Sequence, residues 1–190
     1  MVARFVSGET VEREWVSLDK INPVLVHSVM MSEDAKFCAH HGIDYAALNQ
    51  VIDDALEGEK TRGASTLSMQ TVKNLYLWHG RSYFRKILEL PLALLTDYVW
   101  GKRRMIEIYL NIAEWGEGIF GIEAASQHYF KRSSQNLNAR QSALLAVTLP
   151  NPKSRNAAKA SKNLRRLARK IEQRAYQSGA YIKCLEKSAK

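Results

Sequence analysis

Apolar and polar positions repeat at helical spacing through most of the chain. After the turn signal Asn22–Pro23, for example, apolar residues recur at i, i+1, i+4 and i+5 from Leu25. The predicted helices cover residues 23–33, 45–56, 82–100, 102–110, 122–129, 139–149 and 159–177, and Ser65 or Thr66 is placed to cap one more. Strand signals are few, so the predicted fold class is mainly α.

Proline and glycine positions divide this pattern. We expect Pro91 to kink or break the helix over 82–100, because a proline inside a helix removes a backbone hydrogen bond. Three glycines within 116–121 predict a loop. The last predicted helix has an apolar stripe on one face and basic residues on the others, so it is amphipathic.

The composition is that of a globular domain with a basic charge balance. The 190 residues include 28 Lys and Arg against 19 Asp and Glu, which gives a net charge of +9. This balance predicts an anionic partner, such as nucleic acid, an anionic membrane or a phosphate-bearing substrate, or only a soluble surface. A hydrophobic content of 46% excludes disordered and low-complexity classes. Cys38 and Cys184 are too few for a disulfide framework, and the histidines show no metal-ligand spacing.

No membrane-crossing segment is expected from the sequence. Residues 1–14 mix charged and apolar side chains and lack the apolar core of a secretory signal. The most apolar stretch, 87–100, contains Glu89, Pro91 and Asp97 and is shorter than the roughly 20 residues that a spanning helix needs.

Two glutamates stand out as candidates for chemistry. Glu33 ends an apolar helical stretch, where loss of hydration raises the pKa of a carboxylate and makes it a usable general base. Glu89 is one of only two acids within residues 87–98. Glu89 also follows Arg85 and Lys86, so cations lie one helical turn away. The alternative for each is an exposed or ion-paired glutamate without a chemical role.

Amide and cationic side chains form the second candidate site. Lys73 and Asn74 end the capped helix, and Arg81, Arg85 and Lys86 follow. Lysine and arginine are the natural ligands of phosphate oxygens, and arginine can bind two oxygens at once. A solvated basic face explains the same residues equally well.

Four segments contain nearly all of these candidates. They are Glu33-Asp34-x-x-Phe37-x-x-His40-x-Gly42, Gly63-x-Ser65-Thr66-Leu67-x-x-Gln70-x-x-Lys73-Asn74, Arg85-Lys86-x-x-Glu89-x-x-x-Ala93 and Lys102-x-x-Met105-Ile106-Glu107-x-Tyr109-Leu110-Asn111. In this order they resemble the motifs of the family 51 glycosyltransferases, the peptidoglycan polymerases. The likeness runs over residues 15–166, and four ordered motifs make a chance match implausible.

The resemblance implies a mainly α, lysozyme-like fold with two lobes flanking a cleft. Residues 23–158 would form the catalytic domain, after an irregular lead-in over 1–22 and before a basic amphipathic helix within 159–190, packed on or extending the same domain. The implied reaction transfers the growing glycan from undecaprenyl pyrophosphate onto lipid II, forming β-1,4 linkages with inversion in cell-wall biosynthesis. The implied location is the periplasmic face of the bacterial inner membrane.

The resemblance also assigns roles and partners. Glu33 matches the base that deprotonates the acceptor hydroxyl, and Glu89 matches a second acid linked to the leaving pyrophosphate, directly or through a divalent cation, Mg²⁺ or Mn²⁺. No organic cofactor is implied. The implied substrate-binding residues are Ser65, Thr66, Gln70, Lys73, Asn74, Arg81, Arg85 and Lys86. The implied partners are lipid II, the lipid-linked strand, the membrane surface and cell-wall synthesis or division proteins, but not nucleic acid.

Three features depart from the family pattern or are left open by it. Met69 replaces the first of two glutamines in the second motif, so we expect one amide donor to substrate to be lost. Family members carry a membrane anchor just before the segment that begins here, so we expect one upstream of residue 1. The pairing of Cys38 with Cys184 stays open, because sequence does not give their distance.

Three alternative functions remain at this point. A lytic transglycosylase or lysozyme-type hydrolase would share the fold, but it has no pyrophosphate for the cationic cluster to bind. A basic helical nucleic-acid-binding protein would explain the net charge but neither glutamate. An inactive partner protein of the cell-wall machinery would explain Met69 and the expected but unseen anchor.

Overall fold

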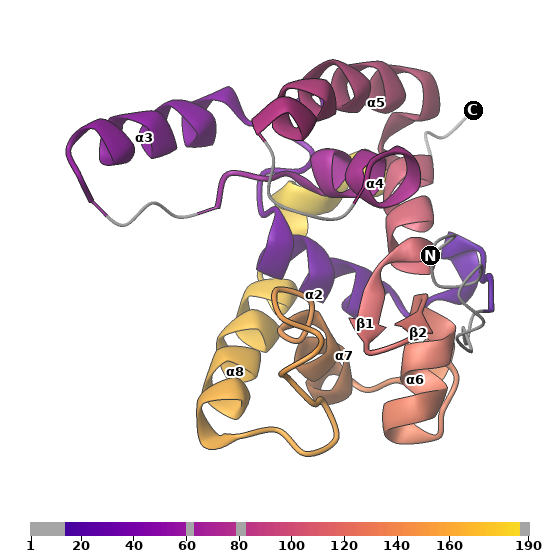
Figure 1. The fold of residues 1–190 in the computed structure, drawn as a ribbon. Helices are drawn as coiled ribbons and strands as arrows, with labels where there is room; N and C mark the ends of the chain where they lie inside the picture. Colours follow the sequence, from indigo (N-terminus) through magenta and orange to yellow (C-terminus); the bar gives the residue numbers. More distant parts are fainter. Residues whose placement is uncertain (1–13, 60–62, 79–82, 187–190) are drawn as a thin grey trace.

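The computed structural model describes residues 14–59, 63–78 and 83–186, and it is mainly helical, as predicted (Figure 1). The elements are η1 (Leu18–Lys20), α2 (Pro23–Glu33), α3 (Tyr45–Leu56), α4 (Leu67–Tyr76), α5 (Tyr83–Ile112), β1 (Glu114–Gly116), β2 (Ile119–Phe120), α6 (Ile122–Phe130), η2 (Ser134–Asn136), α7 (Ala139–Ala146), α8 (Lys162–Tyr176) and η3 (Gly179–Leu185). Within these described ranges, no helix is both long enough and apolar enough to cross a membrane.

Two separate hydrophobic cores define two lobes. The larger core collects buried side chains of α2, α6, α7, α8 and the second half of α5 around Trp115. The smaller core consists of Ile43, Met69, Val72 and Ala93, which come from α4, the first half of α5 and the segment before α3. In Figure 1 the smaller lobe lies above α2, and α7 and α8 lie below it. The two-lobed, lysozyme-like arrangement expected from the resemblance is therefore confirmed.

Polar side chains fix where the helices start. Asn22 caps α2 by accepting a hydrogen bond from the Val24 amide at 2.9 Å, with Pro23 in the first turn. Asp44 caps α3 in the same way, Thr66 caps α4 and Ser161 caps α8. These side chains satisfy amides that the first helical turn leaves without a partner. Local sequence therefore determines most of the helix boundaries.

Helix α5 continues through Pro91, so a break there, one of the two outcomes expected, is wrong. Pro91 lies on the exposed side of the helix, while packing of the opposite side against α4 holds the flanking turns in place. The interruption is at Gly101 instead, where φ is 66° and ψ is 171°, a conformation that glycine adopts most readily. The second half of α5 therefore turns away from the first and enters the larger core.

The glycine-rich segment forms a short hairpin rather than the expected loop. Strand β1 pairs with β2 in antiparallel orientation, with Glu114 opposite Phe120. The hairpin links α5 to α6 and buries Trp115 in the larger core.

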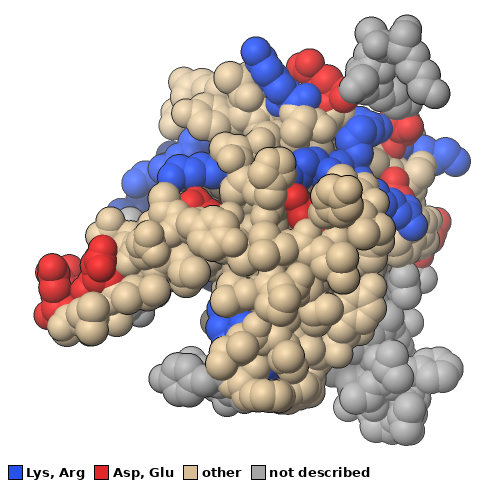
Figure 2. Space-filling view, turned by 90° about the horizontal axis from the view of Figure 1, so that it is seen from above, with Lys and Arg blue, Asp and Glu red and all other residues tan. Residues whose placement is uncertain are grey.

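The first half of α5 exposes a continuous apolar face. Phe84, Ile87, Leu95, Tyr98 and Val99 are each more than half exposed, at 63%, 64%, 58%, 89% and 64%. Separations of three, four and eleven residues among them place all five on one side of the helix. Figure 2 shows uncharged side chains covering this part of the molecule, with charged side chains gathered around it. A soluble helix normally turns such a face inward, so this face is available to another surface.

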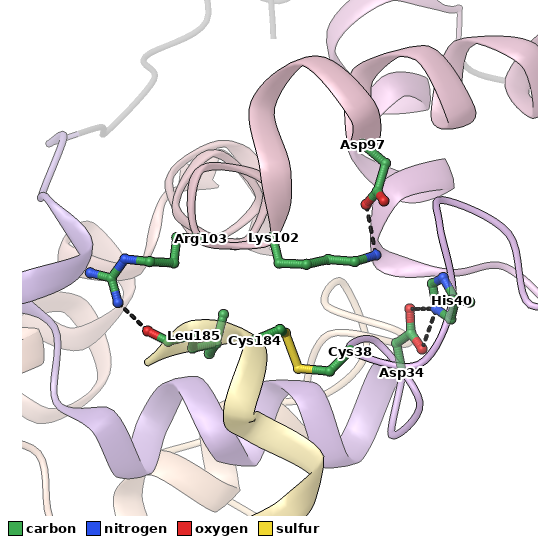
Figure 3. The surroundings of a disulfide bond; sticks show 8 residues. All are labelled: Asp34, Cys38, His40, Asp97, Lys102, Arg103, Cys184 and Leu185. Carbon is green, nitrogen blue, oxygen red and sulfur yellow. Dashed lines mark hydrogen bonds and ion pairs between the residues drawn. A yellow bond between two sulfur atoms is a disulfide. The ribbon is translucent and has the colours of Figure 1, made fainter. Parts of the chain in front are cut away.

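A disulfide bond between Cys38 and Cys184 resolves the pairing left open by the sequence (Figure 3). The two Cα atoms are 5.4 Å apart, although the residues are separated by 146 positions. The bond attaches η3 to the segment that follows α2, and Arg103 of α5 donates a hydrogen bond to the Leu185 carbonyl on the same C-terminal segment.

Removal of this disulfide by Cys38→Ala with Cys184→Ala is expected to lower the free energy of unfolding by about 3–5 kcal/mol, because the bond closes a very long loop in the unfolded chain. Urea unfolding monitored by circular dichroism would measure it, with reduced wild type as the control. A difference below about 1 kcal/mol would contradict the expected stabilisation.

Candidate active site

Glu33 is the last residue of α2, and its carboxylate faces the small lobe. Its Oε2 accepts a hydrogen bond from Gln70 Nε2 at 3.2 Å, and its Oε1 accepts one from the Ser32 hydroxyl at 3.3 Å. Burial raises the pKa of Glu33 above its ordinary value, while the two hydrogen bonds and the charge of Arg155 oppose this shift. The carboxylate is therefore more basic than an exposed glutamate.

The neighbouring Asp34 fixes the position of this carboxylate relative to α4. Asp34 is 9% exposed, and its Oδ2 accepts hydrogen bonds from His40 Nε2 and from the Leu67 amide, both at 3.0 Å. Leu67 is the first residue of α4, so the end of α2 and the start of α4 are joined through one buried carboxylate. Glycine at position 42 lets this segment pack closely against α5, because a Cβ there would lie only 2.6 Å from the Ala93 carbonyl oxygen.

One face of α4 presents Gln70, Lys73 and Asn74, which are spaced by three and four residues. Tyr109, from the second half of α5, donates a hydrogen bond from its hydroxyl to Gln70 Oε1 at 3.2 Å. This bond turns the amide nitrogen of Gln70 toward Glu33. Burial raises the pKa of Tyr109 well above 10, so the phenol stays protonated and remains a donor.

Tyr109 is a site residue that the sequence pattern did not single out. It lies on the apolar face of its helix and is fully buried, which is typical of a core residue. The one available signal was a hydroxyl group on that apolar face within the fourth motif, because a buried tyrosine hydroxyl needs a partner.

Lys73 interacts electrostatically with both candidate glutamates, Glu33 and Glu89. Burial is the main cause that lowers its pKa, and Arg85 and Lys86 lower it further, whereas Glu89 and Glu33 both raise it. Among the residues that the structure describes, no carboxylate lies within ion-pair distance of its ammonium group. A half-buried cation without such a partner is a favourable place for an anion.

Glu89 is 2% exposed and is held by cations on both oxygens. Arg85 pairs with Oε1, and Lys86 Nζ lies 2.8 Å from Oε2. Lys86 also donates a hydrogen bond to Ser65 Oγ at 2.9 Å, which ties the segment before α4 to α5. Glu89 therefore positions two cations next to Lys73.

The structure brings together most of the residues predicted from the sequence. Glu33 contacts Gln70 directly, and Lys73 interacts electrostatically with Glu33 and with the cluster of Ser65, Arg85, Lys86 and Glu89. Asn74 follows Lys73 on the last turn of α4. Arg81 lies outside the described residues.

Thr66 has its hydroxyl fully engaged within the protein. Its Oγ1 donates to the Gly42 carbonyl at 2.6 Å and accepts from the Met69 amide at 3.2 Å, and the residue is 3% exposed. Its observed role is to cap α4 and to hold the segment around Gly42 against that helix.

Met69 does not face Glu33. Its side chain is 1% exposed and packs in the smaller core with Ile43, Val72 and Ala93. The expected loss of an amide donor at this position therefore does not concern the surroundings of Glu33, because a glutamine here would have its amide in an apolar core.

The described side chains do not form a cage for a divalent cation. Within residues 14–59, 63–78 and 83–186, no group of three or more His, Cys, Asp and Glu could hold a metal ion. Both oxygens of Glu89 face cations, and Asp34 is committed to His40 and Leu67. These donors do not fit a metal held mainly by the protein.

A pocket of about 270 Å³ opens beside Glu33. Its walls come from residues 33–36, from Asp44 and Ala47 at the start of α3, and from residues 63–66. The raised pKa of Glu33 and the nearby unneutralised Lys73 give this region a base and an anion site in proximity. That combination suits a reaction that deprotonates one group and releases an anionic one.

Comparison with known proteins identifies close relatives. The family described as Transglycosylase matches residues 1–176. The chain is 63% identical over 174 residues to a biosynthetic peptidoglycan transglycosylase of Rhizobium meliloti (strain 1021), covering 92% of this chain and 74% of the relative. It is 58% identical over 186 residues to a protein of the same name from Brucella suis biovar 1 (strain 1330), covering 98% and 83%. It is also 61% identical over 176 residues to one from Mesorhizobium japonicum, covering 92% and 75%.

Glu33→Gln is expected to gain stability over wild type as the pH rises. The folded-state pKa of Glu33 is raised, so the folded protein holds this proton more tightly than the unfolded chain does. The cost of burying the charge is therefore absent below the unfolded pKa of about 4.5 and complete above the folded pKa. Glutamine avoids this cost, so the stability difference should grow between these two values.

Urea unfolding at a series of pH values from 4 to 8 would measure this difference. The exposed Glu57→Gln serves as a control, and its difference from wild type should stay constant with pH. If the difference in the free energy of unfolding between Glu33→Gln and wild type stays constant or shrinks as the pH rises, the raised pKa of Glu33 is contradicted.

Proposed function

Since this chain belongs to the transglycosylase family, we propose that it is a peptidoglycan glycosyltransferase that extends glycan strands from lipid II in cell-wall biosynthesis. The observation that carries this proposal is the pairing of a buried basic carboxylate, Glu33, with the unneutralised cation Lys73. Glu33 can accept the proton of an attacking hydroxyl, and Lys73 can stabilise the negative charge of a leaving pyrophosphate.

Glu33 acts as the general base in the proposed reaction. In its ionised form it accepts the proton of the acceptor's sugar hydroxyl while that oxygen attacks the anomeric carbon of the donor. The Gln70 amide, oriented by Tyr109, holds the carboxylate in place by donating to Oε2. A raised pKa strengthens the base at the moment when it takes the proton.

Lys73 and the cations beside it stabilise the departing pyrophosphate. Negative charge grows on the phosphate oxygens as the bond between the anomeric carbon and the pyrophosphate breaks, and preorganised cations are most effective against such developing charge. Glu89 keeps Arg85 and Lys86 in position, because its oxygens contact both side chains. We therefore assign Glu89 a positioning role.

The proposed displacement inverts the anomeric carbon. Inversion requires one base on the side of attack and an anion site on the side of departure. Glu33 supplies the base, while Glu89 and Asp34 are engaged with other groups and do not offer a second nucleophile. A Mg²⁺ or Mn²⁺ ion would be coordinated chiefly by pyrophosphate oxygens and water, and no step depends on a metal held by the protein.

The cationic cluster disfavours the hydrolytic alternative. A hydrolase that cleaves a glycan releases a neutral sugar and gains nothing from half-buried cations beside its base. The Lys73 region would only add the cost of desolvating positive charge in such an enzyme.

The disulfide supports action outside the cytoplasm. Structural disulfide bonds form and persist in oxidising compartments such as the periplasm, and they are rare in the reducing cytosol. Cys38 and Cys184 form such a bond here. We therefore propose that the enzyme works at the periplasmic side of the inner membrane, where a lipid-linked substrate is presented.

The exposed apolar face of α5 is proposed to lie on that membrane. The same helix carries Arg85, Lys86 and Glu89 on its other side, so the cation cluster lies within about one helix diameter, roughly 10 Å, of the membrane surface. An apolar face flanked by charged residues is typical of helices that lie in the membrane interface. This placement would present lipid-linked pyrophosphates directly to the cluster.

Leu95→Ser with Tyr98→Ser is expected to weaken binding to phospholipid vesicles roughly tenfold, because both side chains would be buried in the lipid interface. Cosedimentation with vesicles that contain anionic lipid would measure it. Tyr176→Ser with Tyr181→Ser, two residues in and after α8 that are also more than half exposed, should leave binding unchanged. Equal losses in both variants would contradict the assignment of this face.

Glu33→Gln is expected to lower the polymerisation rate at least about 100-fold, because general-base assistance contributes that much or more. The assay incubates purified protein with lipid II, detergent and a divalent cation and separates the glycan products on a gel. Lys73→Ala should raise the apparent KM for the lipid-linked substrate, and Glu57→Gln should behave as wild type.

Near-normal polymerisation by Glu33→Gln would refute its role as the base. A correctly folded wild type that makes no polymer would overturn the proposed activity in favour of a non-catalytic partner protein.

A further inference from the structure

A second pocket, of about 510 Å³, opens between α8 and the segment that follows α7. Three cations line it, namely Arg155, Lys170 and Arg174, together with an apolar wall of Val147, Leu167 and Ile171. Nothing in the proposed reaction uses this pocket.

The cations of this pocket are not neutralised within the described part of the chain. None of the three lies within ion-pair distance of a described carboxylate, and Glu172, the one acidic residue of α8, pairs with Arg140 instead. Arg155 is held in place because its Nη1 donates a hydrogen bond to the Val147 carbonyl at 2.7 Å. The pocket therefore has fixed positive charge beside an apolar surface.

The pocket adjoins the catalytic base directly. Ser32 lines it, and the hydroxyl of this residue donates to Glu33 Oε1. The charge of Arg155 also acts on Glu33. A substrate placed with its reacting hydroxyl at Glu33 can therefore extend a substituent into this pocket.

We propose that this pocket binds a peptide with free carboxylates, carried by the acceptor molecule whose hydroxyl reacts at Glu33; this inference rests on the proposed function. Helix α8, which lines the pocket, lies across α2 from α5 (Figure 1), so the pocket is on the far side of α2 from the helix proposed to lie on the membrane. Lipid-linked pyrophosphates are held at that membrane side, and neutral sugars do not need three cations. The peptide of a peptidoglycan precursor offers both carboxylates and apolar side chains, which match the lining.

The test compares two lipid-linked substrates, one with its peptide carboxylates free and one with them amidated. Lys170→Glu with Arg174→Glu is expected to raise KM for the free-carboxylate substrate about fivefold or more, with kcat changed less than twofold. Amidation should raise KM for wild type similarly, but it should not raise KM for the double variant, whose introduced carboxylates repel the free carboxylates of the peptide. Lys162→Glu with Arg169→Glu changes net charge equally on the opposite face of α8 and should match wild type.

A binding measurement makes the result independent of turnover. A fluorescently labelled form of the same acidic peptide should bind wild type in an anisotropy titration, and the Lys170→Glu/Arg174→Glu variant should bind it at least about fivefold more weakly. The absence of binding by wild type would overturn the proposal, even for a protein that polymerises lipid II normally.

The other outcomes also decide the matter. If the Lys170→Glu/Arg174→Glu variant raises KM equally for the free and the amidated substrate, the pocket senses the pyrophosphate and not the peptide. If the control variant raises KM as much as this variant does, the effect is one of general charge. Either result overturns the peptide assignment. Failure of the proposed function is seen separately, as a wild type that makes no polymer from either substrate.

Discussion

The buried carboxylate of Asp34 is the contact on which the arrangement of the site depends. Asp34 follows the last residue of α2 in the larger lobe, and it accepts a hydrogen bond from the first amide of α4 in the smaller lobe. Because α4 starts at this point, Gln70 on its first turns reaches Glu33, and Lys73 lies one turn beyond. His40 holds the same carboxylate from the following segment, which the disulfide at Cys38 attaches to the C-terminal part of the chain.

This geometry places groups with opposite pKa shifts close together. Burial raises the pKa of Glu33 and lowers that of Lys73, so each is less stable in its charged form than in water. An acceptor hydroxyl that gives a proton to Glu33 and a pyrophosphate that contacts Lys73 would relieve both costs. The protein therefore spends folding stability at these two positions to gain reactivity toward its substrate.

The helices and most residues of the site could be predicted from local sequence. Where the structure differs from these predictions, tertiary contacts are the cause. Caps such as Asn22 and Thr66 act within a few residues, so helix starts could be predicted. Pro91 stays within a helix because packing on the opposite side outweighs its local cost. The inward direction of Met69 and the hydrogen bond from Tyr109 to Gln70 depend on how α4 and α5 pack, which spacing does not reveal.

A direct titration of the Glu33 carboxyl group tests the central claim. Carbon-13 NMR of glutamate-labelled protein would follow this carbon with pH, and Glu33→Gln would identify its signal by the loss of one peak. We expect a pKa above the ordinary 4.5, because burial outweighs the hydrogen bonds from Gln70 and Ser32. A pKa at or below that value would contradict a desolvated general base at this position.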